Sequence, residues 1–215
     1  MSSLLRLLNK IRTVRIRKGF IQTGNTKENS ISIGAGRCAN KINTLEYRNG
    51  ADHNHIEIGD NFSYSNLKIT FTGNHNKLVI GDNVKWSGFI NIVGHGLTAT
   101  IGSNSTGISV MIVCRDENVT IGSGCLFSRD VEIRSNDVHK IYALGSTERI
   151  NKPGPVVIGD RVWIAAKVTV SKGVTIQHDS VISGFSFVNR SIEEPNVVIA
   201  GTPARIVTRG IHWKR

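Results

Sequence analysis

The chain has 215 residues, enough for one domain with a substantial core. Lysine and arginine together number 27 against 16 acidic residues, so the formal net charge is +11. This charge is either an ordinary basic surface or a preference for anionic partners such as an acidic polysaccharide, a phosphorylated cofactor or an acidic membrane. No recognition-helix pattern, zinc-finger spacing or RNA-binding aromatic pattern occurs, so we expect no nucleic-acid partner.

Residues 1–22 form a basic segment that differs from the rest of the chain. Leu4, Leu8 and Ile11 can share one face of a short helix, and every charge among residues 1–20 is positive. The helix could cover the end of the following domain, or it could lie on an anionic membrane surface. Vesicle flotation of the intact and truncated chains distinguishes these two interpretations.

The main domain is expected over residues 23–207, where a repeat recurs roughly every 20 to 25 residues. Its clearest mark is an isoleucine followed by glycine. Because equivalent positions of a repeat stack on one another, we expect these isoleucines to form one column: Ile33, Ile58, Ile80, Ile101, Ile121 and Ile158.

The strongest pattern lies between Val157 and Val188. Branched apolar residues recur at every sixth position, which fits neither an amphipathic helix nor simple strand alternation and is typical of a hexapeptide β-helix. We therefore predict an all-β fold, a parallel β-helix with three faces. The inward positions are Ile158, Ile164, Val170, Ile176, Ile182 and Val188, with Val162, Val168, Val174, Ser180 and Ser186 in a second series.

Histidines and cysteines raise the question of a metal site. His53, His75 and His95 precede three of the Ile-Gly pairs, in turns rich in asparagine and glycine. Such turns favour a ladder of polar side chains, so we predict no metal. The cysteines, Cys38, Cys114 and Cys125, are too few and scattered for a disulfide framework, and the last two suit a core in a reducing cytoplasm.

An interruption of the repeat separates Ile121 from Ile158. The surplus residues, at about 135–154, are charged and turn-prone and should leave the β-helix as an extended loop. His139 stands near its start. After the final coil, residues 208–215 form a basic tail. No stretch is apolar for long enough to span a membrane, and no signal peptide is recognised, so we expect a cytoplasmic protein, with peripheral membrane contact through residues 1–20 as one interpretation.

The chain resembles the hexapeptide-repeat O-acetyltransferases that use acetyl-CoA. The resemblance rests on VVIGDRVWIAAKVTVSKGVTI and VVIAGTPARIV. The run EIRSNDVHKIYALGSTERIN, followed by Trp163, is similar to the bacterial capsule O-acetyltransferases that modify sialic-acid-containing polymers. The resemblance implies a left-handed β-helix and a homotrimer with each active site in a groove between subunits.

Site residues follow from the same resemblance. It implies that His139 is the catalytic base, that Trp163 borders the reacting thioester, and that the pantetheine arm of acetyl-CoA passes Ala166 and Gly184. Arg205 matches an arginine near the adenosine phosphates. The chain departs from the family pattern at Ala165, where glycine is usual, and at Lys167, where a small residue is usual.

The residues suit direct acetyl transfer to a sugar hydroxyl. An imidazole titrates near neutral pH, so His139 could accept the hydroxyl proton, and Asp137 could orient its ring. An N–H group, including that of the Trp163 indole, could face the oxyanion or the sulfur. No cysteine or serine near the motif calls for a covalent intermediate.

Basic residues supply candidates for both substrates. Besides Arg205, coenzyme A phosphates could meet Arg190, Lys172 or Arg209. The flanks of the loop offer Arg134, Lys140 and Arg149 to an anionic carbohydrate acceptor. The function we predict is transfer of acetyl from acetyl-CoA to a capsular polysaccharide. The alternatives are transfer to a small sugar, nucleotide sugar or antibiotic, and a non-catalytic hexapeptide scaffold.

Overall fold

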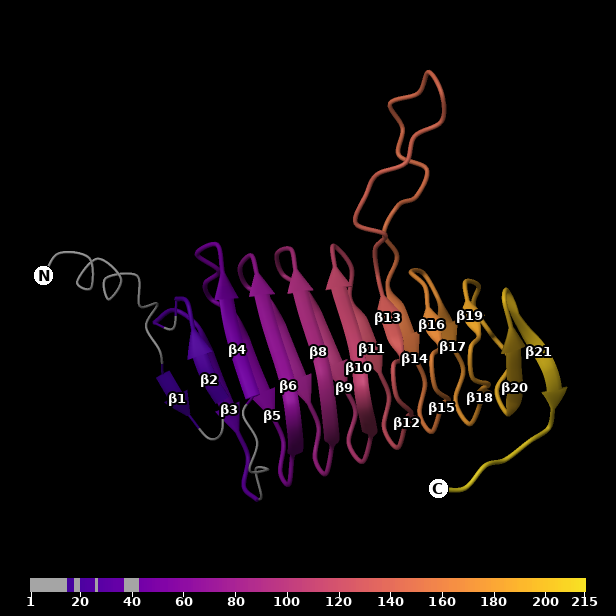
Figure 1. Cartoon of the computed structure of the whole chain (residues 1–215), viewed down its shortest axis with the longest axis horizontal. Helices are drawn as coiled ribbons and strands as arrows, with labels where there is room; N and C mark the ends of the chain where they lie inside the picture. The colour runs from indigo at the N-terminus through magenta and orange to yellow at the C-terminus, as the bar shows by residue number, and fades with distance from the viewer. Residues whose placement is uncertain (1–14, 18–19, 26, 37–42) are drawn as a thin grey trace, which may run out of the picture.

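A computed structural model describes residues 15–17, 20–25, 27–36 and 43–215. These residues form one elongated all-β solenoid, a prism whose coils follow one another along its length (Figure 1). No α-helix occurs in this part of the chain, and so none that could cross a membrane.

The prism has three faces, numbered in the order in which the chain crosses them in each coil. The third face is a seven-stranded parallel sheet. Its strands, in spatial order, are β3 (Ser30–Ile33), β5 (His55–Ile58), β7 (Lys77–Ile80), β9 (Thr98–Ile101), β11 (Val119–Ile121), β14 (Val156–Ile158) and β17 (Thr175–Ile176). The predicted isoleucine column is confirmed, because these residues pair in register from Ile33 to Ile158 and Ile176 continues the column.

The other two faces belong to a fourteen-stranded sheet. The first face contains β12 (Leu126–Phe127), β15 (Trp163–Ile164), β18 (Val181–Ile182), β20 (Val197–Gly201) and the first halves of β6 (Ser63–Thr72), β8 (Lys85–Val93) and β10 (Thr106–Arg115). The second face contains the second halves of these three strands with β2 (Phe20–Thr23), β4 (Asn43–Arg48), β13 (Glu132–Arg134), β16 (Thr169–Val170) and β19 (Phe187–Val188).

Each long strand passes from the first face to the second at a bend. The register of β10 against β8 shifts between Gly107 and Val110 at this bend. Gly88 has φ +122°, and a Cβ there would lie 2.2 Å from the carbonyl oxygen of Val110. A side chain at this position would therefore separate two coils.

The core is a stack of branched side chains inside the prism. All of the predicted inward residues from Ile158 to Val188 are buried, and the second series, Ser180 and Ser186 included, is buried with them. Ser186 satisfies its hydroxyl by donating to the carbonyl oxygen of Ser183 at 2.7 Å. Each fully buried isoleucine or valine contributes about 1.5–3 kcal/mol relative to an exposed one.

Two cysteines belong to this core. Cys114 and Cys125 are buried, and burial raises the pKa of their thiols to about 12 and about 11. A thiol with so high a pKa is a poor nucleophile at neutral pH. The prediction that both are core thiols is confirmed, and Cys38 lies outside the described residues.

The corners of the prism are turns in which polar residues repeat from coil to coil. His53 and His75 occupy left-handed positions, with φ 52° and 59°, and their rings stack with centroids 5.0 Å apart. The ring Nδ1 of His95 accepts a hydrogen bond from the main-chain N–H of Asn74 at 3.2 Å. The histidines thus act as turn residues, and no group of metal-ligating side chains is found among the described residues.

Two strands of opposite direction lie at the ends of the larger sheet. β1 (Arg15–Arg17) pairs antiparallel with β2, and β21 (Ala204–Arg209) pairs antiparallel with β20. Most of the helical segment expected within residues 1–20 lies outside the described residues, but residues 15–17 are strand rather than helix. The solenoid begins before residue 23, because Phe20 is buried and stacks on Tyr64 at 4.7 Å. It also extends beyond residue 207, since β21 pairs with β20 as far as Arg209.

Candidate active site

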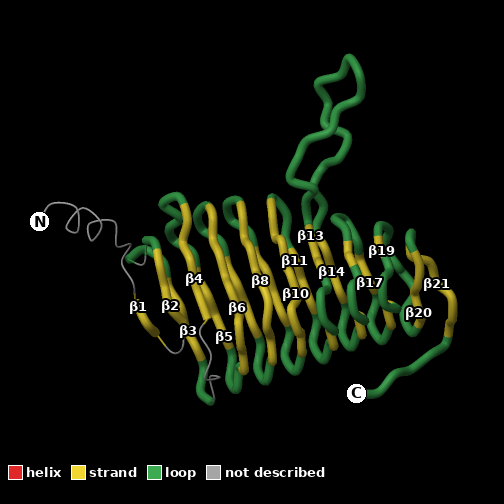
Figure 2. The backbone as a smooth tube through the Cα atoms, viewed as in Figure 1, coloured by secondary structure: helices red, strands yellow, loops and turns green. Residues whose placement is uncertain are grey.

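One long loop leaves the prism. Residues 135–155 connect β13 on the second face to β14 on the third, and the loop projects far from the coils (Figure 2). It lies where the sequence predicts a loop, at about residues 135–154. Figure 1 shows it rising from the edge where β13, β16 and β19 are drawn, whereas β12, β15 and β18 lie along the opposite edge.

Buried polar residues hold the base of this loop. The Ser135 hydroxyl accepts from the Arg115 N–H at 2.8 Å and donates to the Arg115 carbonyl at 3.0 Å. The side-chain oxygen of Asn136 accepts from the N–H of Val138 at 2.7 Å. Because Ser135 and Asn136 are both buried, the loop leaves the prism in a defined direction.

Asp137 is committed to the loop base rather than to the histidine ring. Its carboxylate accepts hydrogen bonds from Lys172 and, at 3.0 Å, from the Asn151 amide. Burial acts to raise the pKa of Asp137, but the bonds from Lys172 and Asn151 outweigh it and lower that pKa. The predicted bond from Asp137 to the His139 ring is not present, and Lys172 is engaged here rather than free for a phosphate.

The main chain of His139 is fixed on both sides. Its N–H donates to the Asp137 carbonyl at 2.8 Å, and its carbonyl accepts from the Asn151 amide at 2.8 Å. The imidazole is exposed and has no hydrogen-bond partner among the described residues. His139 therefore presents a free ring nitrogen from a well-held backbone, as a base acting on an external substrate requires.

The basic residues that flank the loop differ in what they contact. Arg149 donates to the side-chain oxygens of Asn151 and Asn136, both at 3.1 Å, and Arg134 pairs with Glu132. Lys140 is exposed. Of the three predicted acceptor-binding residues, Arg149 thus holds the loop and Arg134 is paired within β13, while no partner of Lys140 is found among the described residues.

Trp163 lies on the first face and points outward, with 38% of its surface exposed. The sequence predicts this orientation, because Trp163 occupies a position of its hexapeptide that normally points outward. The loop that bears His139 leaves the prism at the corner between the second and third faces, whereas Trp163 lies in β15 on the first face, opposite that corner. A single chain therefore does not bring the two residues together.

The predicted path of the pantetheine arm follows the corner between the first and second faces. Ala166 and Gly184 stack there, and a Cβ on Gly184 would lie 3.2 Å from the Ala166 carbonyl oxygen. The Lys167 ammonium lies over the Phe185 ring, 5.6 Å from the centroid, so both of these side chains border the same corner.

Three arginines line a hollow of about 370 Å³ near the end of the prism. They are Arg190, Arg205 and Arg209, and the hollow also contains Ser191 and Ile192. Arg209 is paired with Glu194 at 3.0 Å. The sequence predicts these arginines one by one as phosphate ligands, and the structure gathers them into one surface that an anion can enter.

The tail after β21 turns back along the prism and meets Trp163. The Trp213 indole N–H donates to the Arg161 carbonyl at 2.8 Å, and its ring centroid lies 6.1 Å from that of Trp163. The Arg215 guanidinium donates to the Thr106 hydroxyl at 2.6 Å and to the Asn104 carbonyl at 3.2 Å. The sequence analysis assigned no role to these residues. The feature that could have pointed to one is a tryptophan within an otherwise basic tail.

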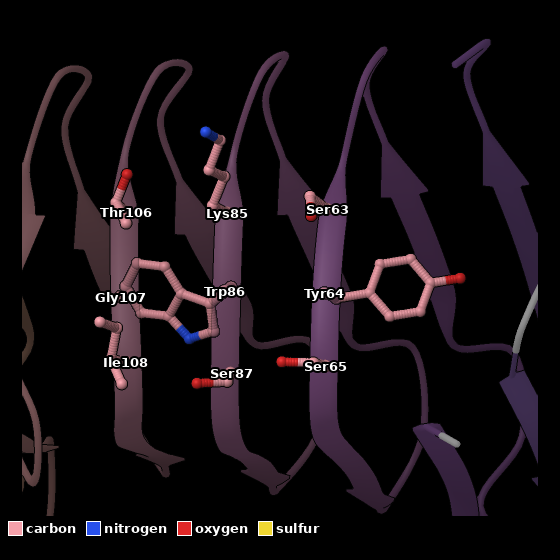
Figure 3. Close-up of a pocket in the computed structure, with 9 residues that line it drawn as sticks. All are labelled: Ser63, Tyr64, Ser65, Lys85, Trp86, Ser87, Thr106, Gly107 and Ile108. Carbon is pink, nitrogen blue, oxygen red and sulfur yellow. The ribbon is translucent and has the colours of Figure 1, made fainter. Parts of the chain in front are cut away.

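A shallow groove of about 400 Å³ crosses the same face further along. It spans three neighbouring strands, β6, β8 and β10 (Figure 3). Lys85, Ser87 and Thr106 contribute polar groups to it, while the Trp86 ring packs over Gly107, whose missing side chain leaves room for the indole.

An ion pair supports the corner beneath Trp213. Hydrogen bonds from Arg161 lower the pKa of Asp179 from its usual 3.8 to about 2. A depressed carboxyl pKa stabilises the fold above the unfolded-state pKa, and this contribution is lost as the pH falls through the folded-state value. We expect the thermal midpoint of the wild type to exceed that of Asp179→Asn above pH 4, and the difference to shrink between pH 4 and pH 2.

This pH dependence is measured by thermal unfolding of both proteins across that range. Asp130→Asn, which changes a carboxylate in another corner, serves as the control for general acid effects. A gap between wild type and Asp179→Asn that stays constant down to pH 2 would contradict the assignment.

Comparison with known proteins decides the family. No family model matches the chain. A polysialic acid O-acetyltransferase from Neisseria meningitidis is 33% identical over 165 residues, which are 76% of this chain and 77% of that protein. The chain belongs to the hexapeptide-repeat O-acetyltransferases.

Further relatives of this O-acetyltransferase agree. A polysialic acid O-acetyltransferase from Escherichia coli is 34% identical over 122 residues, and the chain spans only 39% of its length. The crystal structure of the polySia-specific acetyltransferase NeuO superposes with a TM-score of 0.85 at 30% identity, covering 93% of this chain and 90% of that one. The polysialic acid O-acetyltransferase OatWY gives 0.76 at 30% identity, covering 87% and 91%.

These likenesses confirm two expectations from the sequence. The solenoid is the left-handed parallel β-helix of the hexapeptide family, and the protein is an acyltransferase. The alternative of a non-catalytic scaffold is therefore set aside.

Proposed function

We propose that the protein transfers an acetyl group from acetyl-CoA to a hydroxyl of an acidic bacterial surface polysaccharide, a capsular polymer that contains sialic acid. The observation that carries this proposal is the free imidazole of His139, presented on a rigidly based loop by an O-acetyltransferase scaffold. The names of the relatives and the net charge of +11 support an anionic polymer as the acceptor.

Direct transfer needs only one proton-carrying side chain. The Nε2 or Nδ1 of His139 accepts the proton of the sugar hydroxyl as the oxygen attacks the thioester carbon. The tetrahedral oxyanion then collapses, the carbon–sulfur bond breaks, and the imidazolium returns its proton to the departing thiolate. The products are the acetyl ester and a free thiol, and no protein nucleophile is acylated.

A homotrimer would complete the site. The loop with His139 leaves the corner opposite the face that holds Trp163, so a site containing both requires the loop of one subunit beside the first face of its neighbour. This arrangement supports an active site in the groove between subunits.

The arginine hollow is suited to the phosphates of coenzyme A. A hydrogen bond to a charged group contributes about 1.5–3 kcal/mol, so Arg205→Ala should weaken acetyl-CoA binding roughly tenfold or more and leave kcat nearly unchanged. The measurement is the KM for acetyl-CoA together with its Kd by calorimetry. Acetyl-dephospho-CoA, which lacks the 3′-phosphate, should bind wild type and Arg205→Ala about equally.

Arg48→Ala is the matched control, because Arg48 is paired with Glu46 on the second face, away from the hollow. Equal losses of acetyl-CoA affinity in Arg48→Ala and Arg205→Ala would contradict a specific phosphate contact.

We also infer a cytoplasmic location, with residues 1–20 at the inner face of the membrane as one way of approaching a nascent polymer. The unpaired thiols of Cys114 and Cys125 and the basic composition of residues 1–20 support it.

The function is tested by release of free thiol from acetyl-CoA with a panel of acceptors. Oligosialic acid should support release, and neutral capsular oligosaccharides and free sugars should not. Release with small sugars alone would replace the polysaccharide by a small acceptor, the alternative that a galactoside O-acetyltransferase among the relatives keeps in view.

A further inference from the structure

A single outward-facing row of side chains runs along the first face from Trp163. The strands pair in register, so Trp163 stands beside Leu126, Leu126 beside Thr106, and Thr106 beside Lys85. Ser63 follows Lys85 in the same register. Strands in a sheet lie about 4.8 Å apart, which places the main chain of Lys85 roughly 14 Å from that of Trp163.

Charge and chemistry along this row suit an acidic sugar chain. The row contains an exposed lysine, two hydroxyl groups and an exposed tryptophan, and none of its members is acidic. The ammonium of Lys85 has no carboxylate partner among the described residues. The groove of Figure 3 follows this row over β6, β8 and β10 and is open to solvent.

The tail adds a second cation and a second aromatic ring to the row. Arg215 reaches the row at Thr106, and its guanidinium is seated on a hydroxyl and main-chain carbonyls, with no carboxylate partner in the part of the chain that the structure describes. Because no carboxylate side chain pairs with it there, the guanidinium is available to a sugar carboxylate.

Trp213 lies on the side of Trp163 that faces away from the predicted path of acetyl-CoA. It is bonded to Arg161, in the corner that precedes β15, whereas Ala166 and the predicted pantetheine path lie in the corner that follows β15. The two tryptophan rings, tilted at 48°, thus form an aromatic corner on the side of Trp163 away from the donor path. An aromatic face offers a large rigid apolar surface, suited to the apolar face of a sugar ring.

We propose that Trp213, Arg215 and the outward row from Trp163 to Lys85 form the track on which an acidic polysaccharide lies while one of its residues is acetylated. Trp213 contacts the sugar next to the transfer site, Arg215 meets the carboxylate of a following sugar, and Lys85 meets one further along the chain. The proposal rests on the proposed function and specifies how that site recognises a polymer.

The track predicts that the effect of each substitution depends on acceptor length. Lys85→Ala should raise the KM for a long oligosialic acid several-fold and leave the KM for a sialic acid dimer unchanged, because a dimer held at Trp163 does not extend to Lys85. Trp213→Ala should raise the KM for both acceptors, and none of the variants should change the KM for acetyl-CoA. Arg215→Ala should act on the long acceptor, and added salt should reduce the difference from wild type.

Matched variants separate the track from general effects. Lys77→Ala removes a lysine from the third face, where it is paired with Glu57, and His212→Ala changes an exposed neighbour of Trp213 in the same tail. Both should behave as wild type. Trp213→Phe, which keeps a ring, should recover most of the acceptor affinity lost in Trp213→Ala, as a merely structural loss would not.

Binding is also measured without turnover, by calorimetry of the wild type and the His139→Ala variant with long oligosialic acid. If wild type binds the long chain but transfers no acetyl to it, the track stands and the proposed reaction fails. The track is overturned if Lys85→Ala and Arg215→Ala both leave the affinity for the long chain unchanged, if Lys77→Ala weakens it equally, or if wild type does not bind the chain.

Discussion

Replacement of His139 by alanine should lower kcat by about 10²–10⁴-fold, the contribution that a positioned general base makes to proton transfer. The imidazole is exposed and unbonded among the described residues, so its removal leaves no buried group without a partner and should not unfold the protein. The KM and Kd for acetyl-CoA should change little, because the phosphate hollow lies elsewhere. Steady-state thiol release and calorimetry measure the two quantities separately.

His95→Ala is the matched control for this experiment. His95 is an exposed histidine in a corner turn two coils before the coil that bears the loop, and its ring accepts a hydrogen bond from the main-chain N–H of Asn74. Its substitution should leave kcat within a factor of about two. A fully active His139→Ala protein would refute the assignment of the base, and an equal loss in His95→Ala would show that any histidine substitution disturbs the enzyme.

The largest loss of stability is expected from Phe127→Ala, at about 3–5 kcal/mol in the free energy of unfolding. Phe127 is completely buried, and its ring meets the Trp86 indole edge to face with centroids 5.3 Å apart. The substitution leaves a cavity inside the prism, beside Trp86 and the intervening strand β10, that stacked main chains cannot easily close. Urea unfolding, followed by the fluorescence of the tryptophans, gives the free energy and reports on the surroundings of Trp86.

Phe185→Ala provides the comparison, since it removes the same side chain from a corner where 73% of its surface is exposed. This substitution should lower the free energy of unfolding by no more than about 0.5 kcal/mol, because the side chain is mostly exposed and its contact with Lys167 is weak. Should the two substitutions cost the same, the coil interior would not be the source of stability that the burial of Phe127 indicates.

The core of the fold could be predicted because the spacing of the branched apolar residues shows which side chains point inward. Each hexapeptide contributes one side chain to the interior, so a local period identifies the buried positions from Ile158 to Val188 and the column from Ile33 onward. The same hexapeptide pattern predicts that Trp163 faces outward. The strand at residues 15–17 was harder to predict, because three residues are too few to show a repeat. These residues form a strand because they pair with β2.

The details of the site depend on contacts between distant parts of the chain. Asp137 is close to His139 in sequence, yet its carboxylate accepts a hydrogen bond from Lys172. The stacking of coils brings Lys172 next to it. Trp213 reaches Arg161 across a separation that no local pattern encodes. Sequence spacing therefore identified the residue types of the site, while tertiary packing decided which of them hold the scaffold and which remain free for a substrate.

The strands at the two ends of the larger sheet bear on how long such a molecule can grow. A parallel coil could in principle add to another copy without limit, and open sheet edges are the usual starting points of fibres. Here β1 and β21 each run against the direction of the repeat, so a second molecule cannot continue that sheet in the same register. The antiparallel end strands therefore interrupt the parallel repeat of this sheet, and end-to-end growth by continuation of that repeat is not favoured.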